Sequence, residues 1–314
     1  MSPLFGDAAR HIKGRQRRRP RTAIGAPLAT LLLGLLSCGP WLACDTRAAG
    51  PDPAIATPPA PESSAPKPYA ATCRRAATFR TVLDVGHTVE VPGALSARGA
   101  TEYEFNLRLA REIDKELVAA GFGKTELMIT ADPPPVGLFK RAAHANDIKA
   151  DLFLSVHHDS VPEALLETWQ VDGQEQHFSD RWPGHSLFVS TENPNHAANL
   201  AFARLIGNAL EARGLHYTPH YTDKIMGNRQ RVLLDSKAGV YEYNKLIVLK
   251  ETHMPAALLE AGSIINRTEE LQLATPERQM EIAGAVVEAV DGFCAGRDAK
   301  PRPAQAERSS AKKR

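Results

Sequence analysis

The chain has 314 residues, a formal net charge of +2 and a charged fraction of 24%, the profile of a soluble protein with one or two domains. This total hides an uneven distribution. Residues 1–21 carry +6 and residues 296–314 carry +5, which leaves −9 for residues 22–295. This acidic body, in a chain with only 6% aromatic residues, argues against a nucleic-acid-binding core, where basic side chains and stacking rings gather.

The N-terminal region has the pattern of an export signal. A basic run ending at Arg21 is followed by 23 uncharged residues, up to Cys44, around a leucine-rich centre. Such a basic segment before an apolar one is typical of a secretory signal or membrane anchor. Two cysteines follow small residues here, and the stretch ending at Cys38 resembles a bacterial lipobox. We expect residues 1–44 to direct the chain to the periplasm or cell envelope. Lipidation at Cys38 or Cys44 and an uncleaved membrane anchor remain open alternatives.

Three further regions follow. Residues 45–73 are rich in proline and alanine, with almost no large apolar side chains, which predicts an extended linker. Residues 74–296 form the expected catalytic domain, and residues 297–314 a basic, disordered tail. Cys73 and Cys294 flank the domain. In an oxidising compartment they could form a disulfide that joins its ends, the alternative being two free thiols.

Short apolar runs alternate with longer amphipathic ones in the domain. In chain order they predict a strand at 79–85, a helix at 102–120, a strand at 126–130, a helix at 137–149, strands at 151–157 and 185–191, a helix at 195–213, strands at 246–249 and 256–260, and a helix at 275–293. This alternation predicts an α/β fold: a single domain with a mostly parallel, twisted sheet covered by helices on both faces.

Two stretches lack a regular pattern. The first, 161–183, contains Trp169 and Trp182, and the second, 216–245, contains four tyrosines. Long connections of this kind are often functional. A lid, a sugar-contacting loop and a plain surface insertion are all open interpretations.

Chemically active side chains follow three of the predicted strands. His87 follows the first, His157 ends the third and Glu260 ends the last, while Glu102 opens the first helix. Because ligands of open α/β sheets bind beyond the carboxyl ends of the strands, these four side chains could converge there. Two imidazoles and a carboxylate can hold zinc and leave a fourth position for water. Taken singly each signal is weak, since a glutamate in a first helical turn also interacts favourably with the helix dipole.

Jointly these residues resemble a known family. Four segments are similar, in the same order, to the zinc-dependent N-acetylmuramoyl-L-alanine amidases of the amidase type 3 family: Asp84-Val85-Gly86-His87, Glu102 with Asn106-Leu107, Arg141 with residues 150–157, and Pro255-Ala256-Ala257-Leu258-Leu259-Glu260. The segments span about residues 79–294 and are far more specific together than apart. One departure is Val85, which stands where the family usually has proline.

The resemblance implies a function and a role for each residue. Zn²⁺ would be held by His87, Glu102 and His157, with Glu260 as the catalytic acid and base. The substrate would be peptidoglycan, cut at the amide bond between N-acetylmuramic acid and the L-alanine of the stem peptide. Some relatives are held inactive by an inserted helix, which leaves open whether 161–183 serves that purpose and whether a regulatory protein partner exists.

Two details of the site concern the neighbours of the candidate ligands. His158 adjoins His157, and adjacent side chains of a strand point to opposite faces, so only one can face the metal. The family register favours His157. Asp84 and Asp159 are the nearest carboxylates in sequence that could orient the imidazoles, the alternative being a solvated or capping role.

Other site classes find no support. The sequence contains no HExxH, GxSxG, P-loop or CxxC motif. The remaining rivals to the amidase are a zinc peptidase acting on wall peptides and a non-catalytic wall-binding lipoprotein that keeps the fold.

Overall fold

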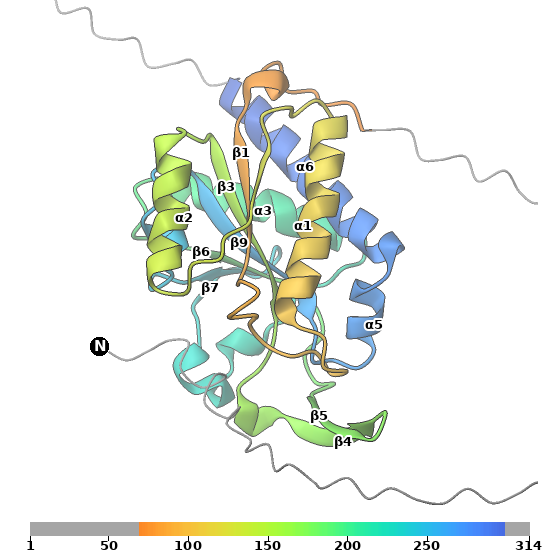
Figure 1. Ribbon diagram of the computed structural model, residues 1–314. Coiled ribbons are helices and arrows are strands. Elements are labelled where there is room, and N and C mark those ends of the chain that lie inside the picture. Colours follow the sequence, from red (N-terminus) through yellow and green to blue (C-terminus); the bar gives the residue numbers. More distant parts are fainter. Residues whose placement is uncertain (1–68, 299–314) are drawn as a thin grey trace, which may run out of the picture. The chain divides into compact units, whose positions relative to one another are not determined.

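Seven strands form one sheet in the computed structural model of the chain, which describes residues 69–298 (Figure 1). Their order across the sheet is β2-β1-β3-β9-β6-β8-β7. The strands are β1 (Thr81–Val85), β2 (Glu126–Met128), β3 (Leu152–Asp159), β6 (Ser186–Val189), β7 (Leu233–Asp235), β8 (Val240–Glu242) and β9 (Ala256–Ser263). β6 runs antiparallel to β9 and β7 antiparallel to β8, whereas the other neighbouring pairs are parallel.

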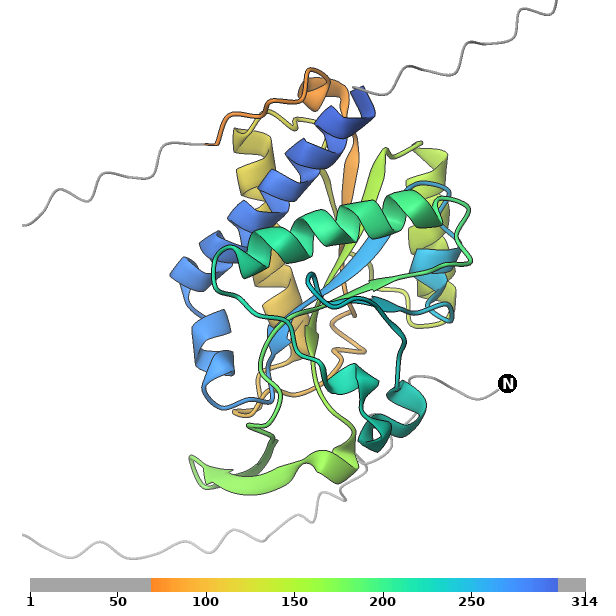
Figure 2. The same cartoon turned by 180° about the vertical axis from the view of Figure 1, so that it is seen from behind.

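Helices cover both faces of this sheet. One face is covered by α1 (Glu102–Ala119), α3 (His196–Glu211) and α6 (Pro276–Asp298), and Figure 2 shows α3 and α6 lying over it. The other face carries α2 (Val136–Asp147), α4 (Ile247–Lys250) and the 3₁₀ segments η3 (His220–Thr222) and η4 (Lys224–Arg229). The predicted α/β fold with a mostly parallel, two-sided sheet is therefore confirmed.

The alternation of side chains along β3 explains why both faces are apolar. Leu152, Leu154 and Val156 pack in the layer with α1, α3 and α6, whereas Phe153 packs in the opposite layer. A strand buried on both faces reads as a continuous apolar run, as this one does in the sequence.

A capping box fixes where α1 begins. The Thr101 hydroxyl accepts a hydrogen bond from the Glu104 backbone N–H at 3.3 Å, and the Glu104 carboxylate accepts one from the Thr101 N–H at 2.9 Å. These bonds satisfy amides that the helix leaves unpaired at its start. Glu102 is thereby fixed as the first helical residue, at the end of the sheet where β1 finishes.

Three sequence-based expectations need correction or completion. The strand predicted at 246–249 is wrong, because Ile247–Lys250 forms the short helix α4, whose Val248 and Leu249 are buried against the sheet. Four apolar residues are too few for their spacing to distinguish helix from strand.

The irregular stretch 161–183 contains a hairpin, β4 (Glu167–Val171) and β5 (Gln174–Phe178), after the 3₁₀ turn η2 (Glu163–Leu165). The stretch 216–245 contains β7 and β8.

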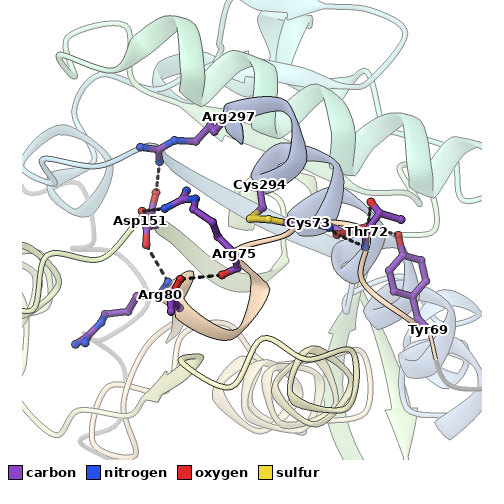
Figure 3. Close-up of a disulfide and its surroundings, with 10 residues drawn as sticks. Tyr69, Thr72, Cys73, Arg75, Arg80, Asp151, Cys294 and Arg297 are labelled. Carbon is purple, nitrogen blue, oxygen red and sulfur yellow. Dashed lines mark hydrogen bonds and ion pairs between the residues drawn. A yellow bond between two sulfur atoms is a disulfide. The ribbon is translucent and has the colours of Figure 1, made fainter. Parts of the chain in front are cut away.

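The two ends of the described chain are fastened to each other. Cys73, just before η1 (Ala76–Thr78), and Cys294 of α6 form a disulfide, as Figure 3 shows. Asp291, one turn earlier in α6, accepts hydrogen bonds from the backbone N–H groups of Thr72 and Cys73 at 2.8 to 3.0 Å. Its carboxylate also accepts the hydroxyls of Thr72 and Tyr69, each at 2.8 Å. Residues 69–73, expected to end the linker, therefore lie against α6.

The expected export segment at 1–44, the linker up to residue 68 and the tail beyond residue 298 lie outside the described residues. Between residues 69 and 298, none of the helices combines the length and apolar composition needed to cross a membrane. The short helix α5 (Glu269–Leu273) completes the fold between β9 and α6.

Replacing both Cys73 and Cys294 by serine should lower the free energy of unfolding. The bond cross-links positions 221 residues apart, so its removal frees the unfolded chain and should cost about 3–5 kcal/mol. Urea denaturation of the double variant and the wild type measures the difference. Dithiothreitol should lower the wild-type midpoint and leave that of the variant unchanged. Equal midpoints for the two proteins would contradict the prediction.

Asp291→Asn should make stability less dependent on pH. Burial opposes ionisation of Asp291, but the hydrogen bonds from Thr72, Cys73 and Tyr69 outweigh it and hold the pKa of this carboxyl below its usual range. A lowered folded-state pKa stabilises the protein above the unfolded pKa of about 3.9, and the gain disappears as pH falls through the folded value.

We expect Asp291→Asn to be less stable than the wild type at neutral pH, with the gap closing below about pH 4. Urea denaturation at several pH values measures this gap. If the difference in unfolding free energy between the two proteins stayed constant across the pH series, the hydrogen bonds would not be stabilising the charged form of Asp291.

Candidate active site

Four predicted residues meet at one end of the sheet. His87 follows β1, His157 lies near the end of β3, Glu260 lies in β9 and Glu102 opens α1. Since β1, β3 and β9 are parallel, their carboxyl ends share one edge (Figure 1). His157 and Glu260 are direct partners in the β3–β9 register, and so lie side by side on the sheet.

The two imidazoles bracket the Glu102 carboxylate. His87 Nε2 lies 3.0 Å from one carboxylate oxygen, and His157 Nδ1 lies 2.9 Å from the other. The two rings are 5.0 Å apart between centroids. Side-chain exposures of 13%, 7% and 16% for His87, Glu102 and His157 place the group in a largely buried position at the rim of the domain.

Two glycines make this close approach sterically allowed. A Cβ at Gly93 would lie 2.4 Å from the Glu102 carboxylate, and one at Gly86 would lie 2.3 Å from the His157 ring. Gly93 also has a φ of +81°, which side-chain-bearing residues rarely adopt. The loop after β1 can therefore fold over the three donor residues only with glycine at these positions.

The three side chains fit a zinc ion by their chemistry and spacing. One donor atom from each lies within 4.8 Å of the other two, and no other group of three such side chains among residues 69–298 is this close. Burial opposes ionisation of Glu102, but His87 and His157 outweigh it and hold the pKa of this carboxyl well below its usual value. A buried carboxylate that stays ionised beside two imidazoles matches the nitrogen and oxygen ligands that zinc takes.

Glu260 has the opposite electrostatic environment. Its Oε2 is buried and has no hydrogen-bond partner among the described residues. Burial, reinforced by the charges of Asp159 and Glu102, raises the pKa of Glu260 well above its usual value, although Arg229 opposes the shift. A carboxyl group with a raised pKa beside a candidate metal site suits the transfer of protons in both directions.

Asp84 does not contact either imidazole, contrary to the orienting role considered from sequence. Its carboxylate accepts hydrogen bonds from Arg141 at 2.6 Å and from the Ser155 hydroxyl at 2.7 Å. Arg141 in turn donates to the carbonyl oxygens of Val85 and His87, each at 2.6 Å. Since His87 has a φ of +69°, which is uncommon for residues other than glycine, this buried guanidinium helps to hold the backbone turn at His87.

His158 lies away from the candidate metal site. Its Nδ1 is 2.8 Å from the Asn106 side-chain oxygen, and its ring packs 5.5 Å from that of Phe105 in the α1 layer. Burial lowers the pKa of His158 to about 3, so the ring is neutral. The Asn106 amide also donates to the Gly86 carbonyl and to Glu102. The structure thus groups His157, and not His158, with the other two candidate ligands.

Asp159 also makes its hydrogen bonds away from the two imidazoles, and only through Oδ1, since its buried Oδ2 has no hydrogen-bond partner among the described residues. It accepts hydrogen bonds from the Tyr221 hydroxyl and the Ser160 N–H, each at 2.7 Å, and lies 3.5 Å from Arg229. Tyr221 and Arg229 were not anticipated as site residues, because they belong to a stretch without periodicity. They border the side of the site that holds Glu260.

The hairpin of 161–183 is fastened to loops beside the site. The Trp169 indole donates to the Ala97 carbonyl at 2.8 Å, and the guanidinium carbons of Arg98 and Arg267 lie 5.1 and 5.2 Å from its ring centroid. Arg267 also lies 3.8 Å from the Phe178 ring centroid. This stretch contains no α-helix, so the inserted helix considered from the sequence is not found in it.

Comparison with known proteins decides the family. The family model described as N-acetylmuramoyl-L-alanine amidase matches residues 81–292, about two thirds of the chain. The chain belongs to the N-acetylmuramoyl-L-alanine amidase family. This confirms the resemblance seen in the sequence, while the roles of the individual site residues stay predictions.

Several known proteins are similar over much of the same region. The N-acetylmuramoyl-L-alanine amidase AmiC of Escherichia coli is 27% identical over 260 residues, covering 75% of this chain and 57% of AmiC. The uncharacterized protein YqiI of Bacillus subtilis is 25% identical over 211 residues, covering 67% and 82% of the two chains. The crystal structure of amidase Ami1 from Mycobacterium smegmatis has a TM-score of 0.53 at 18% identity, covering 70% of this chain and 98% of Ami1, which shows a shared fold.

Arg141→Met should destabilise this amidase-family domain far more than Lys140→Met. The first change leaves the buried Asp84 carboxylate without its cation and should cost about 3–5 kcal/mol. Lys140 precedes Arg141 on α2 and makes an exposed ion pair with Asp132. Its replacement should cost less than about 1 kcal/mol. Urea denaturation of the two variants measures both. Similar losses of unfolding free energy in the two variants would show that the Arg141 hydrogen bonds do not stabilise the loop that carries His87.

Proposed function

We propose that this chain is a zinc-dependent amidase that hydrolyses the bond between N-acetylmuramic acid and L-alanine in peptidoglycan. The observation that carries the proposal is the meeting of His87, Glu102 and His157 beside the unpartnered carboxyl group of Glu260. Membership of the amidase family supports it, as do similar proteins named N-acetylmuramoyl-L-alanine amidase.

His87, Glu102 and His157 would hold the zinc ion. When bound, zinc supplies Lewis-acid chemistry, polarising a carbonyl group and making water acidic near neutral pH. The chain's own contribution is preorganisation. Arg141 holds the His87 backbone, and Asn106 donates to the Glu102 carboxylate, so the donor atoms keep their positions without substrate.

Glu260 would move the protons of the reaction. Its free Oε2 takes a proton from the attacking water and later delivers it to the nitrogen of the departing alanine. Because the amine is a poor leaving group until protonated, the same carboxyl must act first as base and then as acid. The raised pKa of Glu260 favours the second of these steps.

The proposal includes a place in the cell. Peptidoglycan lies outside the cytoplasm, and the segment expected at 1–44 would export the chain to the periplasm or envelope and could tether it to the membrane. The Cys73–Cys294 disulfide supports this, because disulfides persist in oxidising compartments.

Digestion of purified sacculi with the zinc-supplemented protein separates the amidase from its rivals. Mass spectrometry of the soluble products should find intact stem peptides that begin with a free L-alanine amine. Shorter, internally cleaved peptides would point to a peptidase instead. Binding to sacculi without release of peptides would point to a scaffold that keeps the fold.

Glu260→Gln and His87→Ala should fail in different ways. Glu260→Gln removes a proton-transfer group and leaves the candidate ligands in place, so it should keep zinc and lose about 10²- to 10⁴-fold in activity. His87→Ala removes a ligand and should lose both zinc and activity.

Zinc content by elemental analysis and peptide release from sacculi measure the two effects. Equal loss of zinc in both variants would contradict the separate roles assigned to the two residues.

A further inference from the structure

A turn between two of the candidate ligands holds the Glu102 carboxylate. The Glu102 backbone N–H donates to the Ala94 carbonyl at 2.8 Å, and the Ala94 N–H donates to Oε2 of the Glu102 side chain at 3.1 Å. This Oε2 is also the oxygen that lies 3.0 Å from His87 Nε2. Residues 94–101, called the ligand turn below, therefore help to set the direction in which Glu102 presents its oxygens.

The tip of the ligand turn is bonded to the segment that follows β9. The Ala97 N–H donates to the carbonyl of Ile264, the residue after this strand, at 2.8 Å. Arg98 donates to the two carboxylate oxygens of Glu270, from its backbone N–H at 3.1 Å and from its guanidinium at 2.5 Å. Because Glu260 belongs to β9, these bonds join the ligand turn to the loop that follows the candidate acid and base.

The hairpin of β4 and β5 contacts the same tip. The Trp169 indole donates to the Ala97 carbonyl at 2.8 Å, and its ring centroid lies 5.1 Å from the Arg98 guanidinium carbon. Gln176, the cross-strand partner of Trp169, lies so near Gly99 that a Cβ there would be 3.0 Å from its amide nitrogen. Three consecutive residues of the tip thus lie against the hairpin, which Figure 1 shows at the catalytic edge of the sheet.

The hairpin is itself fixed at its base. Just after β5, the Ser179 N–H donates to the Ile265 carbonyl at 2.9 Å. The Asp180 carboxylate accepts hydrogen bonds from the backbone N–H and the Nε of Arg267, each at 3.0 Å. A hinged lid needs a base that can rotate. These contacts favour a fixed support over the lid considered from the sequence.

A fixed support for a ligand has a chemical consequence. Groups that orient a metal ligand change the metal affinity by about 10- to 100-fold when they are lost. Ala94 supplies such a group from its backbone, so its position depends on what holds the ligand turn. We propose that the hairpin is a brace: Trp169 positions the ligand turn, the turn orients Glu102, and the affinity of the site for zinc is higher as a result. The inference rests on the proposed zinc-dependent function and deepens it by assigning Trp169 as a positioning residue.

Trp169→Ala should lower the zinc affinity of the full chain about tenfold, the lower end of the range for groups that orient a ligand. The change removes the bond to Ala97 and the ring beside Arg98, so the Glu102 carboxylate must be ordered when the metal binds. Competition with a chromophoric chelator measures the zinc dissociation constant. The visible absorption of the Co²⁺-loaded chain should change as well, because it reports the geometry of the ligands and not the stability of the fold.

Trp169→Phe should have an intermediate effect. Its ring stays beside Arg98, but it has no N–H to donate to Ala97. The amount of zinc bound at saturation measures the folded fraction of each sample, whereas the dissociation constant describes the folded molecules alone. A variant that folds incompletely therefore still gives a usable value.

Trp182→Ala is the matched control. Trp182 belongs to the same stretch, 161–183, and is partly buried like Trp169. Its ring contacts other residues, lying 5.8 Å from the His220 ring and 4.1 Å from the Arg181 guanidinium carbon. This variant should keep the zinc affinity and the Co²⁺ spectrum of the wild type.

Two outcomes would overturn the inference: a wild-type zinc affinity in Trp169→Ala, or an equal loss of affinity in Trp169→Ala and Trp182→Ala. Either result, together with peptide release from sacculi by the unmodified chain, would leave the amidase function standing. Weaker zinc binding in Trp169→Ala alone, with an unmodified chain that releases no peptides, would support the brace and refute the amidase function. An unmodified chain that binds no zinc would refute both.

Discussion

The buried carboxylate of Glu102 is the constraint on which the catalytic edge depends. Its two oxygens lie within hydrogen-bonding distance of His87, His157, the Asn106 amide and the Ala94 backbone N–H. An ionised carboxylate without partners inside a protein costs several kcal/mol, so these donors must assemble whenever α1 packs on the sheet. The loop after β1, the end of β3 and the start of α1 are therefore positioned by one charge, and the site forms as part of folding.

The same side-chain type performs different tasks within this edge because its environment differs. Glu102 is surrounded by donors and stays ionised, whereas Glu260 lies among like charges in a buried position, which raises its pKa well above the usual value. Separating the pKa values of neighbouring carboxyl groups gives a site a permanent anion and a proton carrier. Asp159 contributes to this separation through its charge on Glu260, a longer-range role than the contact with an imidazole considered from sequence.

Sequence patterns could predict the parts of the molecule governed by local chemistry. The α1 helix has four-residue periodicity and a capping box, and the site histidines follow short apolar runs that form the strands β1 and β3. The helix at Ile247–Lys250 could not be predicted, since its burial depends on strands distant in the chain. The hydrogen-bond partners of Asp84 and the position of Arg229 could not be predicted from the sequence either. Both depend on segments whose packing on the second face of the sheet no local pattern specifies.

The link between Cys73 and Cys294 has a mechanical consequence. The described chain begins and ends at the end of the sheet away from the candidate active site (Figure 1). Tension applied between the two ends would pass through residues 69–73, the sulfur–sulfur bond and the last turn of α6. The disulfide carries this force directly from Cys73 to Cys294, which are 221 residues apart in sequence. The chain between them, which includes every residue of the site, is then not under tension. Pulling on the two ends of the described chain would therefore leave the catalytic edge undistorted.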